Sequence, residues 1–491
     1  MKPTSWTRLA QTPASDIRRL QDKLLQRFVR EELYPFSAHY RRVFDAAGVR
    51  PRDIRGVDDL RRLPFTTKQD LIDAQLDPTR NRDFILIPTP AGIREHWGFL
   101  RKFALVTGGK RSREALRRAY TPSFLTFTTG RSTEPVSFVY TPHDLDILSS
   151  VGGRMLDVHA VTDPSARILN AFPFAPHLAF WQATFCGFET GRMMVPTGGG
   201  KVMGTAGNLR LLERIKTNAL VATPGFAYHL LRRAKEEGAD LSSMQQIILG
   251  AEKVTPGLKR KMAECLEACG AHDVVISGTY GFTEARMAFS ECPTDHDTTP
   301  GYHTYPDLCV IEIIDPETLE PVAEGEDGEI VLTVLAGHGS VVCRYRTGDL
   351  AVGGMTWEPC PHCGRTVPRV SSELRRVTDR HTLNLTKIKG TLVDLSSIGT
   401  VLSDRPDIEE WQVVLTKQNG DPYGLDQFEL KLALRDGTEP DQAQKQIREQ
   451  LIQATEVSPS LISLHSTAEM LECTGMETEM KEKRYVDLRP K

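Results

Sequence analysis

The stretch TTGRSTEPV at residues 128–136 brings several hydroxyl side chains and a glycine together in a short run. Hydroxyls and backbone N–H groups that wrap around a turn are suitable donors for phosphate oxygens. The residues that supply them are Thr128, Thr129, Gly130, Ser132 and Thr133. A second glycine and a lysine, which nucleotide-binding loops of this type carry, are missing. The run therefore predicts a phosphate-binding loop, with an ordinary surface loop as the alternative.

A second polar cluster, GTYGFTEAR at residues 278–286, follows a strand-like run. Tyr280 offers a flat ring for stacking a base, and Thr283 offers a hydroxyl for a phosphate. Glu284 supplies a carboxylate, the kind of ligand that Mg²⁺ prefers. The alternative is a polar loop before a helix, with Glu284 as a solvated charge.

Two shorter motifs add further ligand-binding candidates. GAEK at residues 250–253 follows the run QIIL, and its small residues let a ligand approach the backbone closely. YRTGDL at residues 345–350 carries Asp349, whose carboxylate can accept two hydrogen bonds from a ribose diol. The alternative for GAEK is a tight turn at the end of a strand, and the alternative for YRTGDL is an ordinary turn formed by its Gly-Asp pair.

The elements that must position these motifs alternate between strand-like and helical patterns. Candidate strands are ILNAFPF (168–174), ALVATP (219–224), QIILG (246–250) and VVISG (274–278). Candidate helices are residues 207–217, residues 226–237 and TPGLKRKMAECLEACG (255–270), with Thr255 as N-cap. This alternation predicts βαβ units and a largely parallel sheet, in which ligands lie at the carboxyl ends of strands.

The pattern changes near residue 303. CVIEIID (309–315) and GEIVLTVL (328–335) alternate in polarity, which predicts a smaller antiparallel barrel or sheet. From about residue 379, the runs WQVVLT and QFELKLAL precede a helix at 441–455. We therefore expect an α/β protein with a large N-terminal domain (1–378), which holds mixed or parallel sheets and a small antiparallel barrel-like subdomain. A small α+β C-terminal domain (379–491) follows.

Composition is that of an ordinary soluble protein, with 40% hydrophobic and 25% charged residues in a chain of 491. The net charge of −3 gives no field that would favour a nucleic-acid or membrane partner. The first residues lack the apolar segment of a secretory signal, and no run of about 18 apolar residues occurs. Nine scattered cysteines suit a reducing cytoplasm, where we expect this protein.

The motifs together resemble the adenylate-forming superfamily of acyl-CoA synthetases, adenylation domains and luciferases, and within it the phenylacetate–CoA ligase family. They occur in the family's order: LPFTTKQDL (63–71), TTGRSTEP, AFPFAPHLAFWQATFCG (171–187), GAEK, YGFTE and YRTGDL. The resemblance runs from about residue 17 to residue 489. It implies that a carboxylate attacks the α-phosphate of Mg·ATP to give an acyl-adenylate and pyrophosphate. A mobile C-terminal lid then rotates, and a thiol such as CoA attacks the acyl carbon.

The resemblance also implies roles for individual residues. The β- and γ-phosphates would be held by Thr128, Thr129, Gly130, Ser132 and Thr133, and the adenine would be framed by Gly250, Ala251, Glu252 and Tyr280. The α-phosphate would be bound by Thr283 and the Mg²⁺ by Glu284. The ribose would be bound by Asp349 and Arg376. The hinge would lie near Asp379. MKEKRYVDLR is similar to the family's closing motif GKAKRV-D-R, which implies Lys481 as the catalytic lysine and Lys483 as the alternative. The alternative is that both lysines are solvated charges in the C-terminal tail.

The phosphate loop departs from the family pattern, because Thr133 and Glu134 stand where glycine and lysine are usual. A carboxylate beside a triphosphate repels it, although Arg131 offers a compensating charge. We expect tuned rather than lost ATP binding, and the unusual loop favours specialised metabolism over catabolism.

Aromatic residues in 171–187 predict an apolar pocket, which favours an aryl or arylalkyl carboxylate. The residues expected in it are Phe174, His177, Trp181 and Gly278, with core packing as the alternative. CPHCG at residues 360–364 is a C-x₂-C knuckle, half of many zinc sites. The resemblance implies that Cys292 and His303 complete a structural Cys₃His site with Cys360 and Cys363, with His296 as a competitor and free thiols as the alternative.

Three function classes therefore remain open. The first is an ATP-dependent acid–CoA ligase with ATP, Mg²⁺, CoA and a structural Zn²⁺. The second keeps adenylation but transfers the acyl group to an amine, a carrier-protein thiol or an inorganic nucleophile. The third is a non-catalytic nucleotide-binding homologue, against which Glu284, Asp349 and Lys481 argue. A homodimer is left open.

Overall fold

The computed structural model describes residues 4–128, 135–376, 385–388, 391–417, 426–476, 478 and 482–489. Its largest element is a nine-stranded sheet with the strand order β13-β14-β9-β8-β7-β6-β5-β3-β4. The parallel half comprises β3 (Arg167–Asn170), β4 (Met193–Pro196), β5 (Ala219–Ala222), β6 (Gln246–Leu249) and β7 (Val275–Phe282). The antiparallel half adds β8 (Met287–Ser290), β9 (Tyr302–His303), β13 (Met355–Thr356) and β14 (Arg369–Val370). The predicted α/β class is confirmed.

The central strands β5 and β6 are buried on both faces, which explains why they are continuous apolar runs. Alternate residues point to opposite faces, so Leu169 and Leu220 share one core cluster while Ile168 and Val221 share another. The first face is covered by α11 (Gly199–Arg214), α12 (Pro224–Glu237) and α13 (Pro256–Ala268). The second is covered by α9 (Pro142–Val158) and α10 (Leu178–Thr190).

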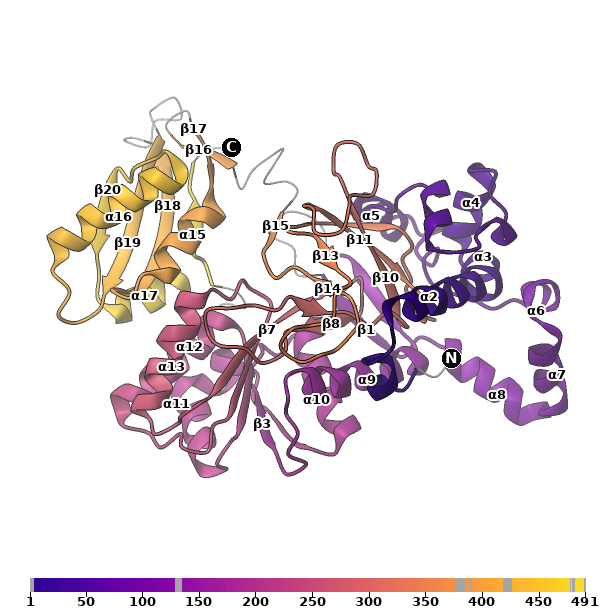
Figure 1. The fold of residues 1–491 in the computed structure, drawn as a ribbon, viewed down its shortest axis with the longest axis horizontal. Helices are drawn as coiled ribbons and strands as arrows, with labels where there is room; N and C mark the ends of the chain where they lie inside the picture. Colours follow the sequence, from indigo (N-terminus) through magenta and orange to yellow (C-terminus); the bar gives the residue numbers. More distant parts are fainter. Residues whose placement is uncertain are drawn as a thin grey trace.

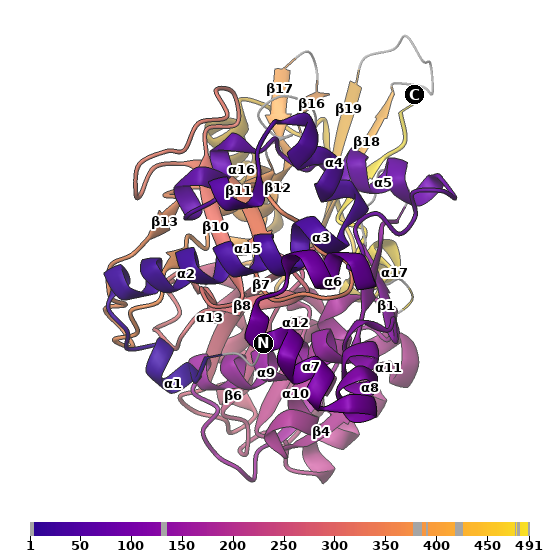
Figure 2. The ribbon, with the colours of Figure 1, turned by 90° about the vertical axis from the view of Figure 1, so that its right-hand side faces the viewer.

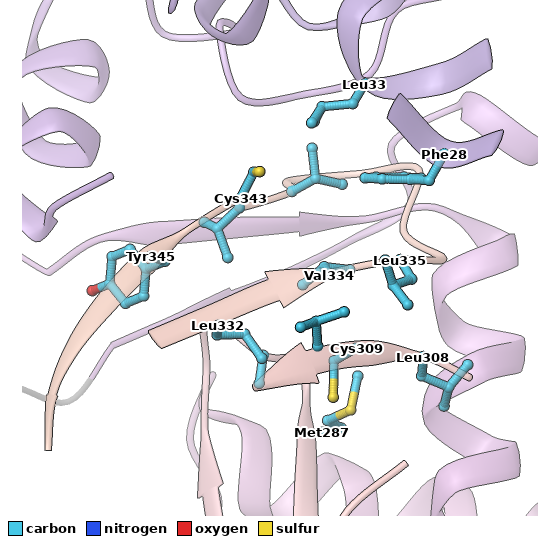
Figure 3. Close-up of a cluster of buried hydrophobic side chains, with 14 of the residues drawn as sticks. Phe28, Leu33, Met287, Leu308, Cys309, Leu332, Val334, Leu335, Cys343 and Tyr345 are labelled. Atoms are coloured by element: carbon cyan, nitrogen blue, oxygen red, sulfur yellow. The ribbon is translucent and has the colours of Figure 1, made fainter. Parts of the chain in front are cut away.

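A four-stranded antiparallel sheet, ordered β10-β11-β12-β15, forms the smaller predicted subdomain. Its strands are β10 (Cys309–Ile314), β11 (Gly328–Val334), β12 (Tyr345–Ala351) and β15 (Leu374–Arg376). Figure 3 shows its inner side chains meeting Phe28 and Leu33 of the N-terminal helices and Met287 of β8 in one core. This core joins the two sheets, so the site motifs on β7 and β12 rest on a common base.

The N-terminal segment is mainly helical and lies on the side that Figure 2 turns toward the viewer. Its elements are α1 (Trp6–Leu9), α2 (Ala14–Phe28), η1 (Val29–Leu33), α3 (Tyr34–Phe36), α4 (Ala38–Ala46), η2 (Pro51–Asp53), η3 (Val57–Arg62), α5 (Lys68–Leu76), α6 (Pro90–His96), α7 (Phe99–Thr107) and α8 (Gly109–Tyr120). The hairpin β1 (Phe124–Phe127) and β2 (Ser137–Tyr140) follows. Among the residues described, no helix has the length and apolar character needed to cross a bilayer.

The C-terminal residues form an α+β unit with its own hydrophobic core, lying beside α12 and α13 (Figure 1). Its sheet, ordered β20-β19-β18-β21, comprises β18 (Ile408–Lys417), β19 (Asp426–Leu434), β20 (Leu461–Leu464) and β21 (Tyr485–Asp487). Helices α15 (Leu395–Asp404), α16 (Pro440–Thr455) and α17 (Thr467–Thr474) and the hairpin β16 (Leu385–Ile388) and β17 (Thr391–Asp394) complete it. The predicted boundary at 378/379 lies outside the described residues.

Some element bounds differ from the predictions. The strand expected over 168–174 ends at Asn170, because Pro173 has no N–H to continue the ladder. The helix expected over 207–217 begins earlier, at Gly199, and is interrupted at Gly204. GTYGFTEAR is not a loop from its first residue, since β7 continues to Phe282 and turns into an antiparallel pairing with β8. Thr255 caps α13 as predicted, accepting a hydrogen bond from the N–H of Leu258.

Candidate active site

The site is organised where β7 of the large sheet meets β12 and β15 of the small sheet. The Tyr280 hydroxyl donates to Asp349 Oδ2 at 2.8 Å, and Arg376 Nη1 lies 3.0 Å from Asp349 Oδ1. Asp349 and Arg376 are register partners on adjacent antiparallel strands. The structure therefore places two residues from separate segments of the chain, Tyr280 and Arg376, against the carboxylate of Asp349.

Glu284 lies in the turn that follows β7. Its Oε1 accepts a hydrogen bond from the Tyr345 hydroxyl at 2.9 Å, which links YGFTE directly to YRTGDL. Burial raises the pKa of Glu284 and the nearby Asp349 charge adds to this, whereas the Tyr345 hydrogen bond lowers it. Thr283, one residue earlier, is buried. A cation placed here would favour the ionised carboxylate.

The GAEK motif leaves β6 beside this cluster. Gly250 has no room for a side chain, because a Cβ there would overlap with Thr279 Oγ1, which itself donates to the Leu249 carbonyl at 2.9 Å. Ala251 has a φ of 72°, in the left-handed region that non-glycine residues rarely adopt. Glu252 then points into a small cleft that it shares with Phe226.

The phosphate loop is described only at its ends. Thr128 and Val136 exchange backbone and side-chain hydrogen bonds that close the loop: Thr128 N–H donates to the Val136 carbonyl at 2.9 Å, and the Val136 N–H donates to Thr128 Oγ1 at 3.0 Å. The Phe127 N–H donates to the Pro176 carbonyl at 2.7 Å, which fixes the loop against the aromatic segment. Thr129, Gly130, Ser132, Thr133 and Lys481 lie outside the described residues, as does Asp379.

The aromatic segment forms a partly exposed cluster at the start of α10. Phe174 is 60% exposed and packs its ring against Phe180 and Trp181, with centroids 5.2 and 5.9 Å apart. Trp181 Nε1 donates to the Ala175 carbonyl at 3.1 Å, and His177 is the N-cap residue of α10. None of these three predicted pocket residues lines the small cleft at Glu252, although Ala171 and Pro173 of the same segment do.

Gly278, the fourth predicted pocket residue, lies inside β7. Its N–H donates to Glu291 Oε2 at 2.7 Å, and a Cβ there would come within 3.0 Å of the same oxygen. Glu291 also pairs with the buried Lys259 at 3.3 Å. The space on this side of Gly278 is therefore filled by a buried ion pair.

A separate cluster gathers three cysteines and one histidine. The ligand atoms of Cys292, His303, Cys360 and Cys363 all lie within 4.8 Å of one another. Cys292 Sγ and Cys360 Sγ are 3.7 Å apart, close to the edge of about 3.8 Å expected for two sulfurs bonded at about 2.3 Å to a tetrahedral zinc. His303 Nδ1 faces the Ser290 carbonyl at 3.2 Å, which leaves Nε2 toward the sulfurs.

The competitor His296 is placed differently. Its Nε2 faces the Val274 carbonyl at 3.3 Å, and among the described residues it is not part of the Cys/His cluster. Cys265 and Cys269, spaced four apart on α13, are buried in the core that covers the large sheet, as expected of packing residues.

Comparison with known proteins agrees with this geometry. Residues 117–336 match the family described as AMP-binding enzyme. A phenylacetate-coenzyme A ligase from Thermus thermophilus is 27% identical over 446 residues, which are 90% of this chain and 87% of that protein. The chain carries the AMP-binding domain of adenylate-forming ligases. The resemblance drawn from the motifs is therefore confirmed.

One further sequence relative and one solved structure are also similar to this chain. A phenylacetate-coenzyme A ligase from Escherichia coli is 27% identical over 318 residues, covering 63% of this chain and 61% of that protein. A crystal structure of 2-hydroxyisobutyryl-CoA ligase in the postadenylation state, in complex with 2-HIB-AMP, has a TM-score of 0.76 at 19% identity. That comparison covers 100% of this chain and 94% of the other, so the shared fold extends over the whole chain.

The AMP-binding domain also contains a buried support that the sequence did not reveal. Arg286, with a φ of 56°, donates from Nη1 to Asp144 Oδ1 at 2.6 Å, and the same carboxylate accepts from the N–H groups of His338 and Gly339. This pair holds the turn that carries Glu284. The only local signal was the TPHD run, in which Asp144 completes the capping box of α9 with Thr141.

Proposed function

We propose that this protein is an ATP-dependent acid–CoA ligase, which activates an aryl or arylalkyl carboxylate as an acyl-adenylate and transfers it to CoA. The observation that carries the proposal is the convergence of Tyr280, Asp349, Arg376 and Glu284 at adjoining strand ends. These residue types suit an adenosine monophosphate with its metal ion, and the relatives named phenylacetate-coenzyme A ligase make an acid the natural second substrate.

The nucleotide would be held mainly through its sugar. Each oxygen of the Asp349 carboxylate has more than one lone pair, so Tyr280 and Arg376 can fix its orientation while it still accepts from the two ribose hydroxyls. Gly250, Ala251 and Glu252 would frame the adenine, against the ring of Tyr280. Thr283 would donate to the α-phosphate. The hydroxyls of the 128–133 loop would bind the β- and γ-phosphates.

Glu284 would hold Mg²⁺, which neutralises phosphate charge when bound. The fit rests on the environment of Glu284: a carboxyl whose pKa is raised by burial and by Asp349 gains stability from a nearby cation. Tyr345 would keep the carboxylate pointing toward the phosphates. Lys481 would stabilise the negative charge that develops on the α-phosphate as the acyl carboxylate attacks.

For the acid, we propose that the pocket is bounded by the aromatic segment, with Phe174, His177 and Trp181 near its entrance. Gly278 would border the pocket through its backbone on the side away from Glu291, because the Glu291–Lys259 pair fills the space on the Cβ side of Gly278. Apolar aromatic surface favours an aryl or arylalkyl group over a short polar acid. The acyl group would cover the exposed ring of Phe174 and so remove its apolar surface from water.

Cys292, His303, Cys360 and Cys363 would hold a structural Zn²⁺, because four ligands leave no coordination position for chemistry. We also propose that residues 1–378 form the catalytic body and residues 379–491 the lid that alternates between the two half-reactions. None of the nine cysteines forms a disulfide and most of them are buried, which suits a reducing cytoplasm.

The proposed function is tested by ATP–pyrophosphate exchange over a panel of aryl and arylalkyl acids, repeated with CoA and with hydroxylamine. We expect exchange with at least one acid and a CoA thioester as product. Exchange without a thioester, but with hydroxamate formation, would favour a different acceptor. No exchange with any acid would support a non-catalytic nucleotide-binding protein.

A further inference from the structure

Glu482 directly follows the proposed catalytic Lys481, and it is buried between the C-terminal domain and the body. Only 7% of its surface is exposed. It lines the same small cleft as Glu252 of GAEK and Phe226 of α12. Consecutive Cα atoms are about 3.8 Å apart, so whatever holds Glu482 also sets the position from which Lys481 extends.

The contact surface for Glu482 on the body is Gly225, the second residue of α12. A Cβ added at Gly225 would overlap with the Glu482 carboxylate, at Oε1. Glycine at this position therefore leaves the space that the carboxylate occupies. The amino end of α12 also carries the positive end of the helix dipole, which suits a polar oxygen.

The charges around Glu482 come from every element packed against it. Arg484 Nε donates to Glu482 Oε2 at 2.7 Å, and Arg484 Nη1 donates to Glu410 Oε2 of β18 at 2.7 Å. Glu252 faces both from the body, and Lys201 of α11 lines the cleft. Three carboxylates thus surround one guanidinium in a buried space.

We propose that Glu482 is a positioning residue: by seating against Gly225, its carboxyl docks the closing motif on the body and brings Lys481 to the α-phosphate for adenylation. The inference rests on the proposed function. Departure of Glu482 from Gly225 is then the step that frees the lid for thioester formation.

A pH dependence of docking follows from the same geometry. Burial raises the pKa of Glu482 to about 8 from an ordinary 4.5, against the opposing effect of Arg484. Docking therefore takes up a proton: it is strongest below about pH 4.5, weakens as pH rises, and levels off above about pH 8. At high pH, the ionised Glu482 carboxylate is repelled by Glu252 and Glu410, and Arg484 is the guanidinium that all three carboxylates surround.

The decisive experiment is a double-mutant cycle between Gly225 and Glu482. Gly225→Ala should lower the adenylation rate about ten- to hundredfold, because its methyl group displaces Glu482. Gly225→Ala combined with Glu482→Ala should recover most of that loss, because the methyl group then fills the vacated space. Thioester formation from a synthetic acyl-adenylate and CoA should be unchanged in both. Gly153→Ala, in α9, is the matched glycine control, since its Cβ meets only an ordinary contact.

Docking of the C-terminal domain through Glu482 and Gly225 can also be measured without catalysis. A dye pair attached through non-natural amino acids at Leu319 of the body and Ile452 of the lid, both exposed, reports docking by energy transfer. We expect docking of the parent chain to weaken from about pH 6.5 to about pH 8 and to change little above that, and docking of Glu482→Gln to stay nearly constant throughout.

Each outcome bears on the proposal. Normal docking in Gly225→Ala, failure of the double variant to restore docking, or equal pH profiles for the parent chain and Glu482→Gln would overturn it. Loss of thioester formation along with adenylation would show a general structural defect instead of a positioning role, and would also overturn it. If no acid supports exchange, the acid-ligase function fails while the energy-transfer result still decides whether Glu482 docks the lid.

Discussion

At the scale of single residues, the site depends on side chains whose charge and orientation are set by neighbours from other motifs. Asp349 is oriented by Tyr280 and Arg376, and Glu284 by Tyr345. We therefore expect nucleotide binding and chemistry to be separable, because the proposed ribose and metal contacts lie within residues 1–378 while the proposed lysine lies within residues 379–491.

Lys481→Ala should separate these two functions. We expect adenylation to fall by about 10²–10³-fold or more, since a mobile ammonium stabilises charge that is larger in the transition state than in bound ATP. ATP affinity, measured by calorimetry, should change little. Lys483→Ala is the control, and a larger loss in that variant would move the catalytic role to Lys483.

Tyr345→Phe should change the pH dependence of the metal site. The Tyr345 hydrogen bond lowers the pKa of Glu284, so its removal raises that pKa further. Protonated Glu284 cannot bind Mg²⁺, so the acid limb of kcat/KM for Mg·ATP should move to higher pH, with a several-fold loss near pH 6 that excess Mg²⁺ reverses. Tyr34→Phe, which removes a tyrosine–carboxylate bond in the N-terminal helices, should leave the profile unchanged. An unshifted acid limb would exclude Glu284 as the titrating ligand.

At the scale of elements, the Cys/His cluster fastens short strands that have little pairing of their own. β9 and β14 are two residues long, and the knuckle that carries Cys360 and Cys363 leads directly into β14. His303 belongs to β9 and Cys292 follows β8. A bound zinc would therefore connect three segments at the antiparallel edge of the large sheet.

Metal analysis of freshly purified protein should find about one zinc per chain. Cys360→Ala should lose the metal and lower the free energy of unfolding by about 3 kcal/mol or more, because it removes a ligand shared by three segments. Chelation should lower Tm in the same direction. His296→Ala should keep both the metal and the stability, since His296 lies apart from the cluster. Zinc-free protein of unchanged stability would contradict the site.

At the scale of the whole molecule, the lid and the body meet through polar contacts. Lys261 Nζ donates to the Ile408 carbonyl at 2.7 Å, and the Gly257 N–H donates to Asp404 Oδ1 at 3.0 Å. Arg435 pairs with Glu264 of α13 at 2.9 Å and with Glu409 of the lid at 3.1 Å. The lid core and the body cores share no buried residue. An interface of this kind favours reversible docking.

Salt should therefore weaken adenylation more than thioester formation. We expect raising the salt from about 0.05 M to about 0.5 M to lower the adenylation rate about two- to fivefold, because exposed ion pairs across the interface are screened. Arg435→Gln should lower the rate at low salt and flatten the salt dependence. Arg233→Gln, which breaks a pair with Glu237 within α12, is the control. An equal salt response in both variants would place the effect elsewhere.

The sequence by itself determined the features that depend on local chemistry. Apolar runs such as QIIL, alternating with helical patterns, predicted the strands of a largely parallel sheet, and Thr255 predicted the start of α13. Motif order identified the AMP-binding domain, because several short motifs in one order are far more specific than any one of them alone.

Only the tertiary structure decided which distant residues meet. It selected His303 over His296 for the Cys/His cluster, joined Tyr345 to Glu284, and seated Glu482 against Gly225. These partners come from elements far apart in the chain, and no periodicity or turn preference encodes such a pairing. The physical reason is that strand register and domain docking bring those side chains together, and both are set by burial over the whole fold instead of by any one segment.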